Sequence, residues 1–223
     1  LIHEKFKNYY RNSEDLISLK RKSFENCDYF ICVSKNTKKD LIEFYNIDPD
    51  KIEVISHGVD HLITENIKSN SLLKFPFLLY VGNRQRYKNF NFFLKAFSKA
   101  KKISNEFKIV CFGGGAFNKD EKNLIRNLSL IDKIIQIDGN DKLLSNYYSQ
   151  ANATIIPSIY EGFGLPLLEA MRFSCPIFCS DIDVFKEICE QNAIFFNPKD
   201  EEDLVYKLEN GMSDSSKLKN FCL

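Results

Sequence analysis

The chain has 223 residues, 44% of them hydrophobic, which is enough for one large domain or for one domain with a piece of another. Its formal net charge of +1 gives no reason to expect a nucleic acid or a strongly anionic membrane as partner. No apolar run is long enough to span a bilayer, and the first residues lack the pattern of a signal peptide.

The seven cysteines are scattered along the chain, and no two of them have the C-x-x-C spacing of a zinc or redox site. Their odd number and their spacing predict reduced thiols rather than a disulfide framework. We therefore expect a cytoplasmic protein, either free or peripheral at the inner face of the membrane.

The first part of the chain predicts two helices and two strands. These are a helix at 13–26, a strand at 28–34, a helix from Ser34 to Tyr45 and a strand at 52–55. Ser34 stands where its hydroxyl can cap the second helix. Residues 61–74 are polar and weakly patterned, which is typical of a linker.

From residue 77 onward, strands and helices alternate about six times. The strands are expected at 77–81, 107–112, 134–137, 153–156, 176–179 and 193–196, and the helices at 90–102, 119–128, 141–149, 165–173, 184–189 and 201–211. This order predicts an α/β fold, a Rossmann-like, doubly wound, mostly parallel sheet with helices on both faces. Ligands of such sheets bind beyond the carboxyl ends of the strands.

The stretch IYEGFGLPLLEA, residues 159–170, follows an apolar strand and opens a helix. Gly162 and Gly164 bracket the turn, and Pro166 falls in the first helical turn, where a missing N–H costs nothing. The first amides of a helix are unpaired and carry partial positive charge, so the amides of Gly164 and Leu165 predict an anion site.

Two carboxylates flank this turn. Glu161 precedes it, and Glu169 lies about one turn into the helix, where we expect it to face back toward the loop. Like charges repel, so these acids suit the hydroxyl groups of a ribose and a sugar on either side of a phosphate. A solvated Glu161 and a Glu169 that only complements the helix dipole explain the spacing equally well.

Two further loops lie at strand ends. Arg84 and Lys88 follow FLLYVG and have the charges to neutralise a diphosphate, although a solvated basic loop is the commoner interpretation of such a segment. Gly113 and Gly114 begin a GGG loop that permits close approach of a nucleobase or sugar. The loop lacks the G-x-G-x-x-G dinucleotide fingerprint, which weakens a nucleotide-dependent oxidoreductase as an alternative.

Two motifs have the residue types of a metal site or a general base, but their positions in the chain indicate structural roles. The segment Asp181-Ile182-Asp183 has the D-x-D pattern of a metal site, yet it follows a late strand of a parallel sheet. His57, in SHGVD, has the chemistry of a general base, but at the domain hinge we expect it to be a structural or rim residue.

Several segments together resemble the retaining, nucleotide-sugar-dependent glycosyltransferases of family four, which have the GT-B fold. They are FLLYVGNRQRYKNF, IVCFGGGAF, IYEGFGLPLLEAM with its E-x7-E signature, SDIDVFKEI followed by AIFFNPKDEEDL, and, upstream, ICVSKNTKKDLIEFYNIDPDKIEVISHGVD. They occur in the family's order over some 200 residues, which chance does not explain.

The resemblance implies a role for each site residue. Glu161, Arg84 and Lys88 would act in catalysis, with Arg84 and Lys88 on the donor diphosphate and Glu161 on the transferred sugar. The donor, a UDP- or GDP-sugar, would be bound by Gly82, Arg84, Lys88, Gly113, Gly114, Gly164, Leu165 and Glu169, with Glu169 on the ribose. No metal is expected, because cationic side chains would stabilise the leaving group.

The resemblance also implies a division of the chain. Residues 1–60 correspond to a remnant of the N-terminal acceptor domain, 61–74 to the hinge and 75–223 to the C-terminal nucleotide-sugar-binding domain. We expect hexosyl transfer to a saccharide or lipid-linked acceptor in cell-surface polysaccharide synthesis of the O-antigen or capsule type. The alternative is a catalytically incomplete binding module that needs a partner chain. Unpartnered strands in residues 1–60 predict a homodimer or poor solubility.

Overall fold

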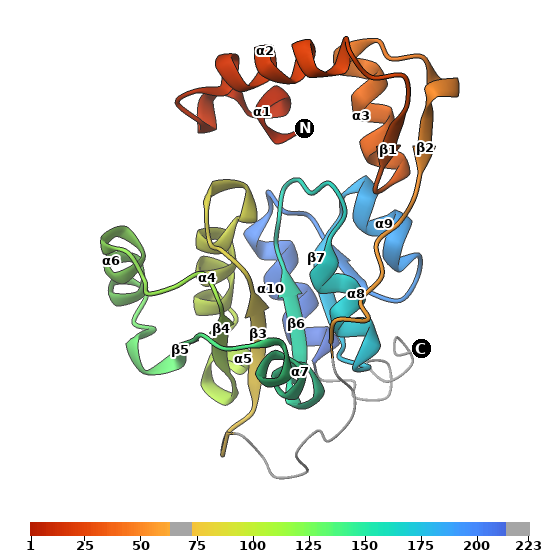
Figure 1. The fold of residues 1–223 in the computed structure, drawn as a ribbon. Coiled ribbons are helices and arrows are strands. Elements are labelled where there is room, and N and C mark those ends of the chain that lie inside the picture. The colour runs from red at the N-terminus through yellow and green to blue at the C-terminus, as the bar shows by residue number, and fades with distance from the viewer. Residues whose placement is uncertain (63–72, 213–223) are drawn as a thin grey trace.

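The computed structural model describes residues 1–62 and 73–212. Most of the chain forms one α/β unit around a six-stranded sheet, and the N-terminal residues form a smaller cap on it (Figure 1). Parts of the expected hinge and of the C-terminal end lie outside the described residues, so the predicted division at 60 and 74 stays a prediction.

The large sheet is wholly parallel and has the strand order β5-β4-β3-β6-β7-β8. Its strands are β3 (Phe77–Val81), β4 (Lys108–Phe112), β5 (Ile134–Ile137), β6 (Ala153–Ile156), β7 (Ile177–Ser180) and β8 (Ile194–Phe196). The chain adds three strands on one side and then returns to add three on the other, which is the doubly wound arrangement. The predicted fold class is therefore confirmed.

Both faces of this sheet are buried, as its continuous apolar strands require. Leu78 and Tyr80 of β3 belong to one core, whereas Phe77 and Leu79 belong to the other, because successive side chains of a strand point to opposite faces. The first core is built with α4 (Phe90–Lys99), α5 (Lys101–Glu106), α6 (Lys119–Asn127) and α10 (Glu201–Gly211), and the second with α7 (Asp141–Gln150), α8 (Leu165–Arg172) and α9 (Asp183–Cys189).

Local sequence signals explain where several helices begin. Asn118 and Glu121 form a capping box at the start of α6, and Asp200 accepts two amides at the start of α10. One expected helix is divided: the run from residue 90 ends at Lys99 and restarts at Lys101, because Ala100 leaves the helical conformation with ψ of 78°.

The N-terminal cap has its own small core. Its elements are α1 (Ile2–Lys5), the 3-10 helix η1 (Lys7–Tyr9), α2 (Ser13–Phe24), β1 (Phe30–Cys32), α3 (Lys35–Tyr45), the 3-10 helix η2 (Pro49–Lys51) and β2 (Ile52–Val54). Strands β1 and β2 pair in parallel, and Cys32, Leu41 and Ile52 are buried between them and α3. The Ser34 cap of α3 is confirmed, since its hydroxyl accepts the Thr37 amide.

The six described cysteines form no disulfide with one another, and five of them are buried. Among the described helices, none combines the length and the apolar character needed to cross a membrane.

Candidate functional site

The site lies where the strand order of the sheet reverses, between the ends of the neighbouring strands β3 and β6. Ligands of doubly wound sheets bind at this position, because the loops diverge there and leave a crevice. The two loops are tied together by the Ile159 amide, which donates to the Tyr87 carbonyl at 2.8 Å. The loop that follows β3 includes a short 3-10 helix, η3 (Arg86–Lys88).

Lys88 and Glu161 meet across this crevice. The Lys88 ammonium donates to Glu161 Oε1 at 2.6 Å, and the Ser158 hydroxyl donates to the same oxygen at 2.8 Å. No group in the described part of the chain donates to the other carboxylate oxygen. The structure thus brings together two of the three predicted catalytic residues and adds Ser158 as the group that orients the carboxylate.

The turn after Glu161 presents backbone donors. Gly164 has φ of +115°, and a Cβ atom there would lie 2.9 Å from the Phe185 ring, so only glycine fits without strain. The amides of Phe163, Gly164 and Leu165 make no hydrogen bond to any described residue. Phe163 is only 8% exposed and Leu165 is 37% exposed, and unpaired amides at the start of a helix are well suited to an anion.

Glu169 occupies a separate, buried position on α8. Its carboxylate accepts the Tyr148 hydroxyl at 2.7 Å and lies 3.5 Å from His61 Nε2. Burial, reinforced by the negative Glu169, raises the pKa of Tyr148 well above 10, so this tyrosine remains a donor at neutral pH. The described contacts of Glu169 are therefore with Tyr148 and His61, whereas none joins it to Lys88 or Glu161.

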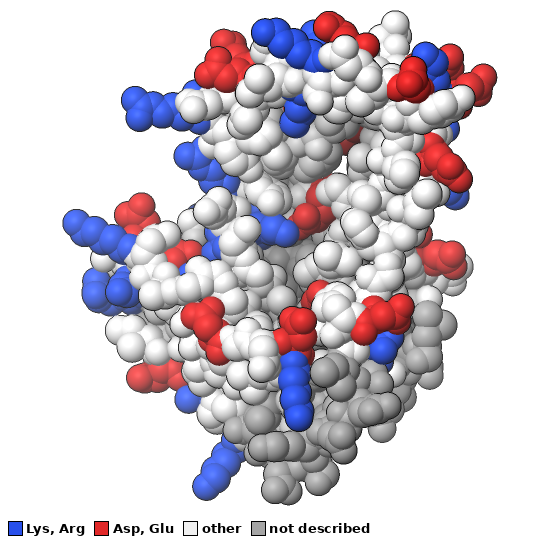
Figure 2. All heavy atoms as spheres, viewed as in Figure 1, with Lys and Arg blue, Asp and Glu red and all other residues white. Residues whose placement is uncertain are grey.

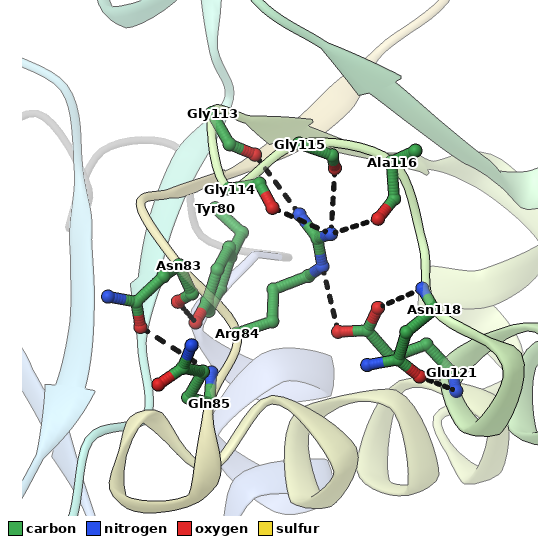
Figure 3. A network of polar contacts seen from close by, with 10 residues as sticks. All are labelled: Tyr80, Asn83, Arg84, Gln85, Gly113, Gly114, Gly115, Ala116, Asn118 and Glu121. Atoms are coloured by element: carbon green, nitrogen blue, oxygen red, sulfur yellow. Dashed lines mark hydrogen bonds and ion pairs between the residues drawn. The ribbon is translucent and has the colours of Figure 1, made fainter.

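Arg84 makes its described contacts with the glycine loop and Glu121, and none of them joins it to Lys88 or Glu161, so its place on a diphosphate stays a prediction. Its guanidinium donates to the carbonyl groups of the glycine loop, at 3.0 Å to Gly113 and 2.8 Å to Gly115, with longer contacts to Gly114 and Ala116 (Figure 3). Its Nε donates to Glu121 at 3.0 Å, and the residue is 8% exposed. Arg84 is therefore not a solvated basic side chain, and its contacts hold two loops together.

The glycine loop is shaped around that guanidinium. Gly113, Gly114 and Gly115 all have positive φ, which turns their carbonyl groups toward Arg84. A Cβ on Gly114 would lie 2.8 Å from the carbonyl oxygen of Gly82, so the loops after β3 and β4 pack backbone against backbone. Close approach is thus required at Gly114, but the partner is the protein itself.

The N-terminal cap contacts the turn directly. Ser34 and Thr37 both donate to the Gly162 carbonyl, at 2.7 and 2.8 Å, and the Tyr160 hydroxyl donates to Asp40 at 2.8 Å. The sequence reasoning missed these partners of the turn. Only the capping position of Ser34 was visible beforehand, because contacts between segments more than 100 residues apart leave no local pattern.

His57 and the segment 181–183, for which we expect structural roles, lie beside the glycine turn and at the start of α9. His57 packs edge-on against Phe163 with 5.3 Å between ring centroids. Asp181 forms an ion pair with Lys186, and Asp183 opens α9. Within residues 1–62 and 73–212, no cluster of three histidine, cysteine or acidic side chains is arranged to hold a metal ion.

A pocket of about 270 Å³ extends from Glu161 toward the N-terminal cap. Polar groups from both parts of the molecule line it, including Lys5 and Asn36 on one side and Asp181 and Asp183 on the other. Figure 2 shows the molecule hollowed between the cap and the larger unit, with side chains of both charges in the hollow. Such a lining suits a polyhydroxylated ligand better than an apolar one.

The fold is that of the GT-B glycosyltransferases. The structure of Anabaena Alr3699/HepE in complex with UDP and glucose superposes with a TM-score of 0.78, at 14% sequence identity, over 96% of this chain and 61% of that one. At this identity the similarity establishes the fold alone.

Two family models cover the sequence: Glycosyl transferases group 1 over residues 62–222 and Glycosyltransferase Family 4 over residues 2–61. The chain therefore belongs to the group 1 glycosyltransferases, and the resemblance inferred from its motifs is confirmed.

Curated relatives of the chain are named as glycosyltransferases, one of them for an O-antigen chain. The O-antigen chain mannosyltransferase RfbU of Salmonella typhimurium is 32% identical, over 86% of this chain and 53% of the relative. The N-acetylgalactosamine-N,N'-diacetylbacillosaminyl-diphospho-undecaprenol 4-alpha-N-acetylgalactosaminyltransferase of Campylobacter jejuni is 28% identical, over 71% of this chain and 42% of the relative. The chain spans about half the length of these relatives.

Proposed function

We propose that this chain is a glycosyltransferase that binds a nucleotide sugar and transfers its sugar to a saccharide or lipid-linked acceptor in cell-surface polysaccharide synthesis. The observation that carries the proposal is the row of unpaired amides at residues 163–165, which follows Glu161 and its ion pair with Lys88. Amides at a helix start and an ammonium group together make a site for a diphosphate, the group that leaves in sugar transfer.

In this proposal Lys88 and the turn amides hold the donor diphosphate and stabilise the charge that develops on it. Glu161 accepts a hydroxyl of the transferred sugar through its second oxygen, since Ser158 and Lys88 both bind the first. Glu169, oriented by Tyr148, accepts the ribose hydroxyls. These donors neutralise the leaving group without requiring a metal ion.

The sugar is a hexose transferred with retention of configuration, as the E-x7-E motif implies. The names of the relatives, a mannosyltransferase and an N-acetylgalactosaminyltransferase that acts on a diphospho-undecaprenol-linked saccharide, support a hexosyl donor and a saccharide or lipid-linked acceptor. The complex of Alr3699/HepE with UDP and glucose supports a nucleotide donor.

The alternative is a binding module that transfers sugar only with a partner chain. This chain covers only about half of each relative's length, which supports this alternative. The two alternatives differ in one measurement, sugar transfer to a saccharide acceptor by this chain alone.

Calorimetry with UDP and GDP tests the donor site. The substitution Lys88→Met is expected to weaken binding of the preferred nucleotide by roughly 10- to 100-fold, the effect of losing a charge-assisted hydrogen bond. The substitution also leaves the negative charge of Glu161 unpaired beside the phosphates, and this repulsion should weaken nucleotide binding further.

The matched control is Lys102→Met, which removes an exposed lysine from α5 and should leave nucleotide binding unchanged. Equal nucleotide affinity of the wild type and Lys88→Met would overturn the role of Lys88. A wild-type chain that binds neither UDP nor GDP at millimolar concentration would overturn the donor site as a whole.

A further inference from the structure

One face of helix α3 is directed at the glycine turn of the proposed donor site. Ser34, Thr37 and Asp40 are spaced three residues apart, so they lie along one side of a helix. Ser34 and Asp40 are buried, although polar, and all three bind the segment 160–162 from 120 or more residues away. A helix in the N-terminal cap thus holds a loop that belongs to the α/β unit.

The hydrogen bonds to Gly162 determine how its peptide is oriented. Two hydroxyl groups donate to one carbonyl oxygen, at 2.7 and 2.8 Å, which satisfies both of its lone pairs. In a trans peptide the C=O and the following N–H point in opposite directions. The Phe163 amide is therefore directed away from α3, as the first of the three unpaired amides.

The contact between α3 and the turn is reinforced on both sides. Tyr160 donates to Asp40, which also forms an ion pair with Lys5 at 2.8 Å. The carboxylate of Glu187, on α9, accepts the amides of Lys35 and Asn36 at 2.7 and 3.1 Å, at the start of α3. These contacts fix the helix relative to the loop on either side of Gly162.

We propose that Ser34 and Thr37 are positioning residues for the donor site, which hold the turn 162–165 so that its amides converge on the diphosphate. This rests on the proposed function, since the ligand is the nucleotide diphosphate assigned above. The two hydroxyls act only through the Gly162 carbonyl and do not touch the ligand.

Thr37→Val is the informative substitution, because it removes the hydroxyl and keeps the shape of the side chain. Nucleotide affinity, measured by calorimetry with UDP and GDP, is expected to fall about 2- to 10-fold, the effect of one hydrogen bond. Thr37→Ser keeps the hydroxyl and should therefore bind nucleotide with the affinity of the wild type. The control Glu43→Ala, at an exposed position of the same helix, should bind like the wild type, and melting temperatures identify any general loss of stability.

Hydrogen exchange of the turn, measured without ligand, tests the same idea independently of donor binding. Peptides that cover residues 158–166 should exchange faster in Thr37→Val than in the wild type and return to the wild-type rate in Thr37→Ser. Unchanged exchange, or unchanged nucleotide affinity in Thr37→Val when the wild type binds, overturns the positioning role. A wild type that binds no nucleotide overturns the donor site instead, and the exchange result then still decides whether α3 holds the turn.

Discussion

Arg84 is a charged side chain on a loop of the candidate site, and its described contacts are with the protein itself. Its guanidinium has five N–H donors in a planar fork, and the glycine loop supplies carbonyl groups around it at hydrogen-bonding distance. The ring of Phe117 lies 4.7 Å from the guanidinium carbon and covers one face. Arg84 therefore sets the relative position of the loops after β3 and β4.

Removal of Arg84 is expected to destabilise the fold. Arg84→Met leaves the Glu121 carboxylate and the loop carbonyls without their buried partner, so the free energy of unfolding should fall by about 3 kcal/mol or more. Urea titration measures this, with Arg126→Met as the control, because Arg126 is an exposed arginine on α6, the helix that carries Glu121. A decrease in the free energy of unfolding of less than about 0.5 kcal/mol would contradict the role of Arg84 in holding the two loops together.

The helices bring buried tyrosines against carboxylates. Tyr148 on α7 reaches Glu169 on α8, and Tyr160 reaches Asp40 on α3. Burial, together with the adjacent carboxylate, raises the pKa of both tyrosines above the usual value of 10. Each pair thus joins two segments through a hydroxyl that must stay protonated.

These tyrosines predict loss of stability at alkaline pH. Their pKa values are raised in the folded protein, so above pH 10 the unfolded chain releases the protons while the folded chain retains them, and the free energy of unfolding falls as pH rises. Each tyrosine lowers the free energy of unfolding by up to about 1.4 kcal/mol per pH unit in this range. In urea titrations between pH 9 and pH 11, the free energy of unfolding should decline less steeply with pH for Tyr160→Phe than for the wild type. Identical slopes of the two proteins would contradict this expectation.

The chain as a whole combines a well-buried α/β unit with a thin cap. The outer surface of the cap is apolar in places: Tyr29 is 79% exposed, Ile31 70% and Ile55 50%. Ile31 points outward because its neighbour Cys32 points into the small core, as alternation along a strand requires. Large exposed apolar side chains beside a two-stranded sheet favour association.

We predict that the isolated chain associates with itself through this surface. Light scattering over a range of concentrations should show dimers or larger species, and Ile31→Lys should reduce their fraction without lowering the melting temperature. Lys35→Met, which changes an exposed lysine of α3, is the control. A wild-type chain that stays monomeric at high concentration would contradict the prediction.

Much of the larger unit could be predicted from local patterns. The strand from Phe77 to Val81 and the helix from Glu201 to Gly211 occur as the apolar runs and caps indicated, since periodicity follows directly from backbone geometry. The position of the E-x7-E turn at the end of β6 was visible for the same reason. The split of one helix at Ala100 was not, because no glycine or proline marks it.

What the amino-acid order determined by itself was the alternation of strands and helices, the edge of the sheet at which the loops gather, and the family. What only the tertiary structure decided was the partner of each polar side chain: Arg84 binds the glycine loop, Lys88 reaches Glu161, and Thr37 reaches Gly162. Element type depends on neighbours within a few residues, whereas a hydrogen bond depends on which distant backbone lies within 3 Å. That distance is set by the packing of all the elements together.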